Sequence, residues 1–165
     1  LFKNTDQAVC DAVLRELVRE GKLRAERDRF ALAEFSVRLT KRQSALKERL
    51  LQIYRKAGLE TPGLDEVYAG FAPNELTDCK QVVESLVSGG ELVMLTPQIC
   101  IHRQVYDEIA EKTRAYFAEK DELTLAEFRD MLDTSRKYAL AVLEYFDKNK
   151  ILKKEGDIRR MGQGF

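Results

Sequence analysis

The sequence predicts a mainly α-helical protein with small β hairpins, and three observations lead to this prediction. Apolar residues recur at helical spacing along most of the chain. Three amphipathic helix ends are each followed by Gly or Asn, a polar residue and an aliphatic residue that can open a strand, at Leu23, Leu92 and Ile151. A turn signal follows each of these strands. The order of helix, tight turn, helix and two-stranded wing is that of a winged helix-turn-helix, so tandem modules of this kind are expected.

Each repeat is predicted to end its helix in the left-handed backbone conformation. Gly21, Gly90 and Asn149 stand at this point, and Gly and Asn are the residues that tolerate this conformation best. The aliphatic residue two positions later then turns inward and starts the wing. On this basis the chain divides into three segments, which are residues 1–40, 41–103 and 104–165.

Residues 1–40 are predicted to be the C-terminal half of a truncated winged helix. Asn4 and Gln7 are spaced as a capping box, and the helix that they open runs to Glu20. A hairpin with its turn near Asp28 follows. The two helices that should come first are missing, and the sequence begins abruptly without a start Met. We therefore expect a fragment of a larger protein.

Residues 41–103 are predicted to form a complete winged helix with an acidic surface. Helices are expected at 44–57, near 64–71 and at 75–88, and strands at 92–95 and 99–101. Between Gly58 and Ile101 the only basic residue is Lys80. The acidic residues of this stretch are Glu60, Asp65, Glu66, Glu75, Asp78, Glu84 and Glu91. A polyanion would be repelled here, so a spacer or protein-contact module is expected.

Residues 104–165 are predicted to form a second complete winged helix. Helices are expected at 104–119, 124–132 and 135–148, and wing strands at 151–154 and 158–161. Thr124 and Glu127 form a capping box at the start of the middle helix. From Asp133 onward the chain is basic, although its formal net charge as a whole is zero. This segment is therefore the one that would attract a polyanion.

Composition excludes several classes of protein. No apolar run approaches the length needed to span a membrane, and no signal-peptide pattern is present. Cys10, Cys79 and Cys100 are scattered and odd in number, which favours reduced thiols in a cytoplasmic protein. His102 is the only histidine, so a Cys/His zinc site lacks an adequate ligand set.

Catalysis has little support in this sequence. It holds no Gly-rich phosphate loop followed by Lys-Ser/Thr, no hydrolase triad and no acidic motif with metal-ligand spacing. Most of its acidic residues suit solvated helix faces. We therefore expect no enzymatic activity, no cofactor and no metal in this chain.

Nucleic-acid binding is the stronger hypothesis, and it applies to the last segment. Ser135, Arg136, Lys137 and Tyr138 lie at the start of its final helix, where backbone N–H groups favour a phosphate. Tyr138 could stack on a base or pack inside. Four further basic residues alternate along the wing strands, so only some of them can share one face: Lys153, Lys154, Arg159 and Arg160. The same charges also suit the solvated surface of a purely structural winged helix.

Three stretches of the last segment resemble a known family. They are Leu125–Leu140, Leu143–Asp147 and Gly156–Arg160, and they are similar to the last winged helix of bacterial selenocysteine-specific elongation factors. Leu17–Leu23 and Ile101–Gln104 resemble other parts of the same array more weakly. The resemblance implies four tandem winged helices behind a GTPase, of which this chain would hold half of the second and all of the third and fourth.

The resemblance also implies a function and a site. The last winged helix of the family binds a hairpin, the selenocysteine insertion hairpin, in a messenger RNA just after an in-frame UGA codon. This tethers selenocysteinyl-tRNA near the ribosome. Arg136, Lys137 and Tyr138 match the start of the hairpin-binding helix, and Asp157, Arg159 and Arg160 match its wing. The chain departs from the family at Lys153-Lys154, where the family has Arg-Arg, so bidentate contacts are lost there.

Two other readings remain open at this point. A DNA-binding transcriptional regulator would prefer a duplex and would usually dimerise, whereas a structural array would bind no nucleic acid. The sequence shows no leucine-rich dimer helix, so we expect a monomer. The joints near Leu39 and Arg103 are short and are not rich in Gly or Ser, so a limited hinge is expected between segments.

Overall fold

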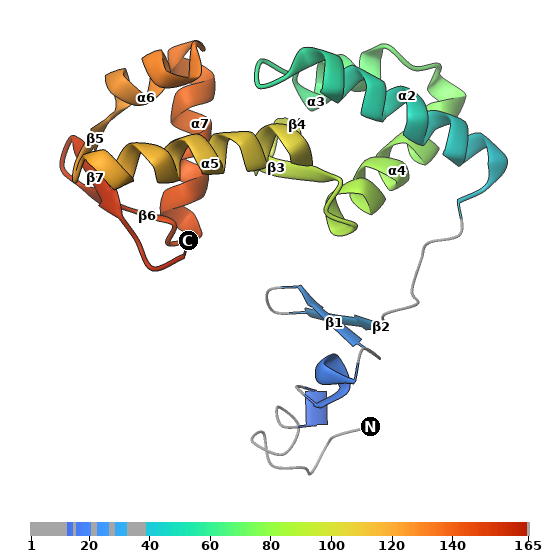
Figure 1. Cartoon of the computed structure of the whole chain (residues 1–165). Coiled ribbons are helices and arrows are strands. Elements are labelled where there is room, and N and C mark those ends of the chain that lie inside the picture. Colours follow the sequence, from blue (N-terminus) through green and yellow to red (C-terminus); the bar gives the residue numbers. More distant parts are fainter. Residues whose placement is uncertain (1–12, 15, 21–22, 27–28, 33–38, 165) are drawn as a thin grey trace. The chain divides into compact units, whose positions relative to one another are not determined.

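The computed structural model describes residues 13–14, 16–20, 23–26, 29–32 and 39–164 (Figure 1). The chain separates into two units, Leu1–Arg38 and Leu39–Phe165. The predicted capping box at Asn4 and the predicted left-handed Gly21 lie outside the described residues, as does Cys10.

The first unit contains a helical turn and a hairpin. Residues 16–19 are helical, and Arg19 forms an ion pair of 2.7 Å with Glu16, in line with the charge alternation of this helix. Strands β1 (Leu23–Glu26) and β2 (Arg29–Leu32) pair antiparallel, with Glu26 opposite Arg29. The predicted hairpin is therefore confirmed, and its turn at Asp28 lies outside the described residues.

The second unit begins with a three-helix winged helix. Its elements are α2 (Lys41–Ala57), α3 (Leu64–Ala69), the short η1 (Pro73–Glu75), α4 (Leu76–Ser88), β3 (Leu92–Thr96) and β4 (Ile99–His102). Helix α2 begins earlier than predicted because Thr40 caps it, with Gln43 completing a capping box. Leu50, Tyr54, Val82 and Leu86 are fully buried and join α2 to α4.

A second winged helix follows directly. Its elements are α5 (Arg103–Glu119), β5 (Leu123–Thr124), α6 (Leu125–Leu132), α7 (Arg136–Lys148), β6 (Leu152–Glu155) and β7 (Ile158–Met161). The capping box of Thr124 and Glu127 is present as predicted. Strand β5 was not predicted. It pairs with β7, which gives a three-stranded sheet in the order β5-β7-β6 (Figure 1).

The predicted left-handed position at the end of the last helix is wrong by one residue. Asn149 has a φ of −91°, and the left-handed residue is Lys150, with a φ of 59°. The N–H of Ile151 then bonds to the carbonyl of Phe146, as that of Glu91 bonds to Leu86 after α4. Lys150 therefore corresponds to Gly90, and the third repeat starts its wing at Leu152. Asn149 instead bonds through its side chain to the Tyr145 carbonyl.

The β3–β4 wing contributes to the hydrophobic cores of both winged helices, and its Leu92 and Cys100 are buried with residues of α2 and α4. Val93, Leu95, Ile99 and Ile101 of the β3–β4 wing are buried in the same cluster as the core of the second winged helix. Strand β3 lies alongside α7. Strand β4 ends at His102 and α5 begins at the next residue, so no linker separates the modules. The hinge expected near Arg103 is thus bridged by packed side chains.

Candidate nucleic-acid interface

The first turn of α7 holds the predicted contact residues Arg136 and Lys137. Both side chains are exposed. Ser135 is the N-cap, with extended backbone, but its side chain makes no capping hydrogen bond. At α2 and α6 the cap side chain accepts a hydrogen bond from the N–H of the third helical residue. The start of α7 therefore lacks the local capping bond that these two helices have, and helix starts of this kind attract anions.

The preceding winged helix holds the segment before this turn. Glu60 Oε1 accepts one hydrogen bond from the Thr134 hydroxyl and another from the Ser135 N–H, both at 2.9 Å. These two bonds hold the pKa of Glu60 below its usual range, with the Ser135 bond the larger cause. The carboxylate thus stays charged and stays an acceptor under ordinary conditions. Ser135 is therefore engaged through its backbone.

Tyr138 is half-buried and anchored. Its hydroxyl donates a hydrogen bond of 2.7 Å to the carbonyl of Thr61. The Lys137 ammonium lies 5.0 Å from the centre of the Tyr138 ring, within cation–π range. The sequence left open whether Tyr138 stacks on a base or packs inside the protein. Its contacts favour packing, and its ring lies against the ammonium of Lys137.

The rest of α7 is covered for most of its length. Val142, Leu143 and Phe146 are fully buried, and Ala141 is almost so. Leu140, which the sequence placed on the same buried stripe, is only half-buried. Strand β3 of the preceding module lies alongside this helix. The exposed basic residues of α7 are Arg136 and Lys137 in its first turn and Lys148 in its last turn.

Arg159 lies inside the protein and not on the wing surface. Its residue is 3% exposed, and its Nε donates a hydrogen bond of 3.0 Å to Asp147 of α7. The other carboxylate oxygen of Asp147 is buried without a hydrogen-bond partner among the described residues. Alternation along β7 explains the placement, because neighbouring residues of a strand face opposite sides. Arg159 therefore ties the wing to α7 and cannot meet an RNA in this conformation.

The remaining predicted residues of the wing lie on both of its faces, because Lys153 stands opposite Arg160 in the β6–β7 pairing and Lys154 stands opposite Arg159. Lys153, Lys154 and Asp157 are exposed, and Arg160 is half-buried. Glu155 accepts from Lys153 at 2.6 Å and from Arg160 at 3.1 Å, and Arg160 also pairs with Glu122. Lys153 and Arg160, which share one face of the wing, are thus partly neutralised by carboxylates. Lys154 has no ion-pair partner within the described part of the chain, which leaves it the most available cation of the wing.

The preceding module uses its basic residues internally. Arg42 of α2 lies 3.4 Å from Asp78, and Lys47 forms a hydrogen bond of 2.5 Å with Glu91. These pairs place the positive charges of α2 against the acidic side chains that the sequence pointed out. Such partly exposed pairs contribute little to stability, but they reduce the field that α2 presents to a polyanion.

Sequence reasoning missed Glu60, Thr61 and Thr134 as parts of the candidate interface. The two carboxylate bonds join residues that are more than seventy positions apart, and no local pattern signals such a contact. Only the three-dimensional placement of one module against the next reveals them. Glu60 was counted among the acidic residues of a spacer module.

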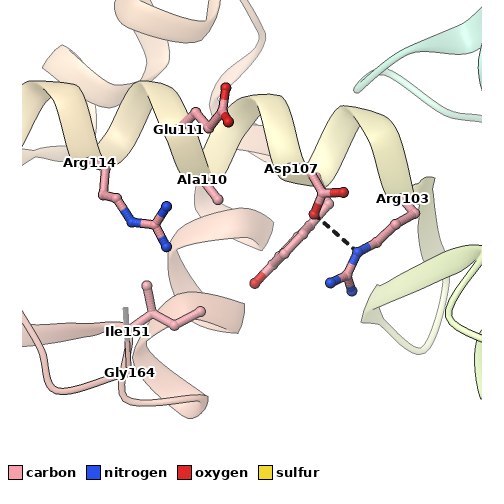
Figure 2. A pocket seen from close by; sticks show the side chains of 8 residues that line it. Arg103, Asp107, Ala110, Glu111, Arg114, Ile151 and Gly164 are labelled. Carbon is pink, nitrogen blue, oxygen red and sulfur yellow. Dashed lines mark ion pairs between the residues drawn. The ribbon is translucent and has the colours of Figure 1, made fainter.

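A separate pocket of about 290 Å³ lies along α5 (Figure 2). Arg103 and Arg114 stand at its two ends. Tyr106 is also among the residues that line it. Arg103 forms an ion pair of 3.0 Å with Asp107, and Glu111 adds a second acidic group. Positive and negative side chains balance here, so the pocket does not extend the basic surface of α7.

The described residues contain neither a metal-binding cluster nor a membrane-spanning helix. No group of three or more His, Cys, Asp or Glu side chains among them is placed to hold a metal ion. In the same part of the chain, no helix is long and apolar enough to cross a membrane. Cys79 and Cys100 are buried and free, and burial raises the pKa of Cys100 to about 11.

Comparison with known proteins places this site in context. Residues 115–161 match a family described as the winged helix of elongation factor SelB. The selenocysteine-specific elongation factor of Desulfomicrobium baculatum is 32% identical over 151 residues, which are 90% of this chain and 23% of that protein. The chain thus spans less than a quarter of this curated relative.

Two solved structures share the fold. One is the mRNA-binding domain of elongation factor SelB from E. coli in complex with SECIS RNA, with a TM-score of 0.59 and 19% identity over 76% of this chain and 100% of that one. The other is a bacterial selenocysteine-specific elongation factor, EF-Sec, with a TM-score of 0.60 and 12% identity over 96% of this chain and 26% of that one. At these identities the structures support the winged-helix fold alone.

Proposed function

Since residues 115–161 belong to the winged-helix family of elongation factor SelB, we propose that this chain binds an mRNA stem-loop through its last winged helix. The observation that carries the proposal is the form of the exposed surface. Arg136 and Lys137 project from the first turn of α7, and β3 of the preceding module lies alongside the helix. The exposed surface at this end is a basic helix start beside a wing.

Such a surface suits RNA better than DNA. The major groove of A-form RNA is too narrow to admit a helix along its length, so proteins grip its backbone and read looped-out bases. The two exposed cations of the helix start can hold a phosphate, and Lys154 of the wing can hold a second one. A DNA reader would lay its recognition helix in the major groove, but β3 flanks α7.

The relatives indicate the biological setting of this proposal. One is a selenocysteine-specific elongation factor, and a related domain was solved in complex with SECIS RNA. We infer that the chain tethers such a factor to a message in the cytoplasm, at a hairpin that follows a UGA codon. The ribosome would be engaged through the rest of the factor. No cofactor is needed for this step, because binding rests on side chains and backbone amides.

A binding titration tests the proposal. The chain is titrated with a fluorescently labelled hairpin from a UGA-containing message, with duplex DNA and with a single strand, each at several salt concentrations. We expect the hairpin to bind most tightly, with an affinity that falls as salt rises. The double variant Arg136→Ala, Lys137→Ala should bind roughly 10- to 100-fold more weakly, with a salt slope smaller by about one or two.

The matched control removes the same charge elsewhere. Lys41→Ala with Lys112→Ala takes two exposed cations from α2 and α5 and should leave the affinity within about twofold. Equal affinity of the native chain for hairpin and duplex would overturn the proposed function. Unchanged hairpin affinity in the Arg136 and Lys137 double variant would overturn the site.

A further inference from the structure

We propose that Glu60 positions the RNA-contact end of α7, so that the preceding winged helix is a working part of the RNA site. The inference rests on the proposed function. Glu60 carries a negative charge and so is repelled by RNA. It binds the Thr134 hydroxyl and the Ser135 N–H, the two groups directly before Arg136. It acts through these groups, which set where the first turn of α7 begins.

Comparison of helix starts shows what Glu60 replaces. At α2 the N–H of the cap residue Thr40 bonds to Gln43, and at α6 that of Thr124 bonds to Glu127. In both cases the acceptor is the third residue of the helix itself. The third residue of α7 is Tyr138, which offers no carboxylate. The cap N–H of α7 instead bonds to Glu60, from the other module.

The segment that carries Glu60 is fixed in place. Thr61 is fully buried, and its hydroxyl donates a hydrogen bond of 2.7 Å to the carbonyl of Cys100 in β4. The N–H of Leu64 donates to the Gln98 carbonyl in the turn of the same hairpin. Leu59 packs against the hydrophobic cluster that the β3–β4 wing forms with the second winged helix. The short loop is therefore tied to the β3–β4 wing, and a group attached to it has a defined position.

A second contact extends this control to Lys137. The Thr61 carbonyl accepts a hydrogen bond from Tyr138, and the ring of Tyr138 lies under the Lys137 ammonium. Glu60 and Thr61 of the preceding module thus bind residues on both sides of Arg136, which are Ser135 before it and Tyr138 after it. Orientation of this kind matters for binding, because side chains already held in place lose less entropy when the RNA arrives.

Whether hairpin affinity rises or falls when Glu60 is replaced distinguishes a positioning role of Glu60 from simple repulsion of the RNA by its charge. Removing a carboxylate from an RNA-facing surface reduces repulsion, so charge alone predicts that Glu60→Ala binds the hairpin more tightly. Positioning predicts the opposite. The conservative variant Glu60→Gln keeps an oxygen acceptor for Thr134 and Ser135 while it removes the charge, so positioning predicts near-native affinity for it.

Hairpin titrations of Glu60→Ala, Glu60→Gln and Thr134→Val test the inference, with Glu84→Ala as the charge-matched control on exposed α4 surface. Glu60→Ala should weaken binding roughly tenfold and lower the salt slope by about 0.7 to 0.9, as expected for one lost phosphate contact. Thr134→Val changes no charge but removes the hydroxyl that donates to Glu60. It should weaken binding about threefold, because only one of the two hydrogen bonds to Glu60 is lost. Glu60→Gln and Glu84→Ala should stay within about twofold.

The titrations distinguish failure of the positioning role of Glu60 from failure of the proposed RNA-binding function. If the native chain shows no preference for the hairpin, the proposed function fails. If the native chain binds and Glu60→Ala binds equally or more tightly, this inference is overturned. Thermal unfolding of each variant accompanies the titrations. Loss of binding in Thr134→Val at unchanged folding supports positioning even where Glu60→Ala does not fold.

Discussion

Lys150 holds a backbone conformation that glycine holds in the preceding module. Its φ is 59°, and that of Gly90 is 74°. The side chain of a non-glycine residue crowds the backbone in this region, at a cost of roughly 1 to 2 kcal/mol. The Lys150 N–H still bonds to the Asp147 carbonyl, which closes the end of α7. The chain tolerates the strain because this helix end must turn into β6.

Relieving this strain should stabilise the protein. Lys150→Gly is expected to raise the free energy of unfolding by about 0.5 to 1 kcal/mol, since part of the relief is offset by the greater freedom of glycine in the unfolded chain. Gly90→Ala should have the opposite effect, by about 1 kcal/mol. Urea unfolding followed by circular dichroism measures both. A lower stability of Lys150→Gly would contradict the assignment of strain.

Glu127 links the stability of the second winged helix to pH. Hydrogen bonds from the Thr124 N–H and then from the Thr124 hydroxyl, together with Tyr116 and Lys120 beside the carboxylate, lower the pKa of Glu127 to about 2. A carboxyl group whose pKa is lowered by folding stabilises the protein above its unfolded pKa, near 4.5. That contribution is lost as the pH falls from about 4.5 to about 2.

The expected result is a steeper loss of stability in acid for the native chain than for Glu127→Gln. Unfolding free energies from urea titrations between pH 6 and pH 2.5 measure the slopes of both proteins. Glu144→Gln removes an exposed carboxylate of α7 and serves as the control, with a slope like that of the native chain. Equal slopes for Glu127→Gln and the native chain would rule out this linkage.

At the scale of single elements, the helices were easier to predict from the sequence than the short strands. The burial of individual charged side chains was also hard to predict. The capping box at Thr124 and the apolar periodicity of α7 are local signals, and both α6 and α7 lie where they indicate. Strand β5 has only two residues and exists because β7 offers it a partner. Arg159 shares its residue type with Arg160, so composition could not tell the buried one from the half-buried one.

The wing offers a test that separates structure from binding. Arg159→Ala leaves the Asp147 carboxylate unpaired beside the core and should cost about 3 kcal/mol of stability. Lys154→Ala changes an exposed residue, so it should leave stability within about 0.5 kcal/mol and lower hairpin affinity by about two- to fivefold. Thermal unfolding and the hairpin titration measure the two quantities. The reverse pattern would mean that Arg159 is free to meet RNA.

At the scale of the whole molecule, residues 39–165 form one unit built from two repeats. The repeats themselves were readable from the sequence. Their joining was not, because the wing residues Leu95 and Ile99 look like ordinary strand residues of their own module. The same holds for Glu60, whose partners lie in the other repeat. Contacts between repeats depend on the relative placement of two folded surfaces, which periodicity does not encode.

Because the β3–β4 wing belongs to the cores of both winged helices, the two are expected to unfold together. Leu95→Ala, in β3, should destabilise the unit by about 2 to 4 kcal/mol, and it should do so for α5 and α7 as much as for α2. Amide hydrogen exchange resolves the three helices and measures the effect on each. Faster exchange confined to α2 and α4 would mean that the two winged helices unfold independently.

Strand β3 and the loop at 59–63 contact α7 and the segment before it. These contacts limit where a shorter, stable fragment of the protein can begin. A piece that began at Arg103 would lack Glu60 and Thr61, and it would expose apolar side chains that now face Leu95 and Ile99. Exposed patches of this kind promote aggregation. A portable RNA-tethering tag taken from this chain should therefore start at Leu39 and include both winged helices, even though only the last one carries the basic helix end.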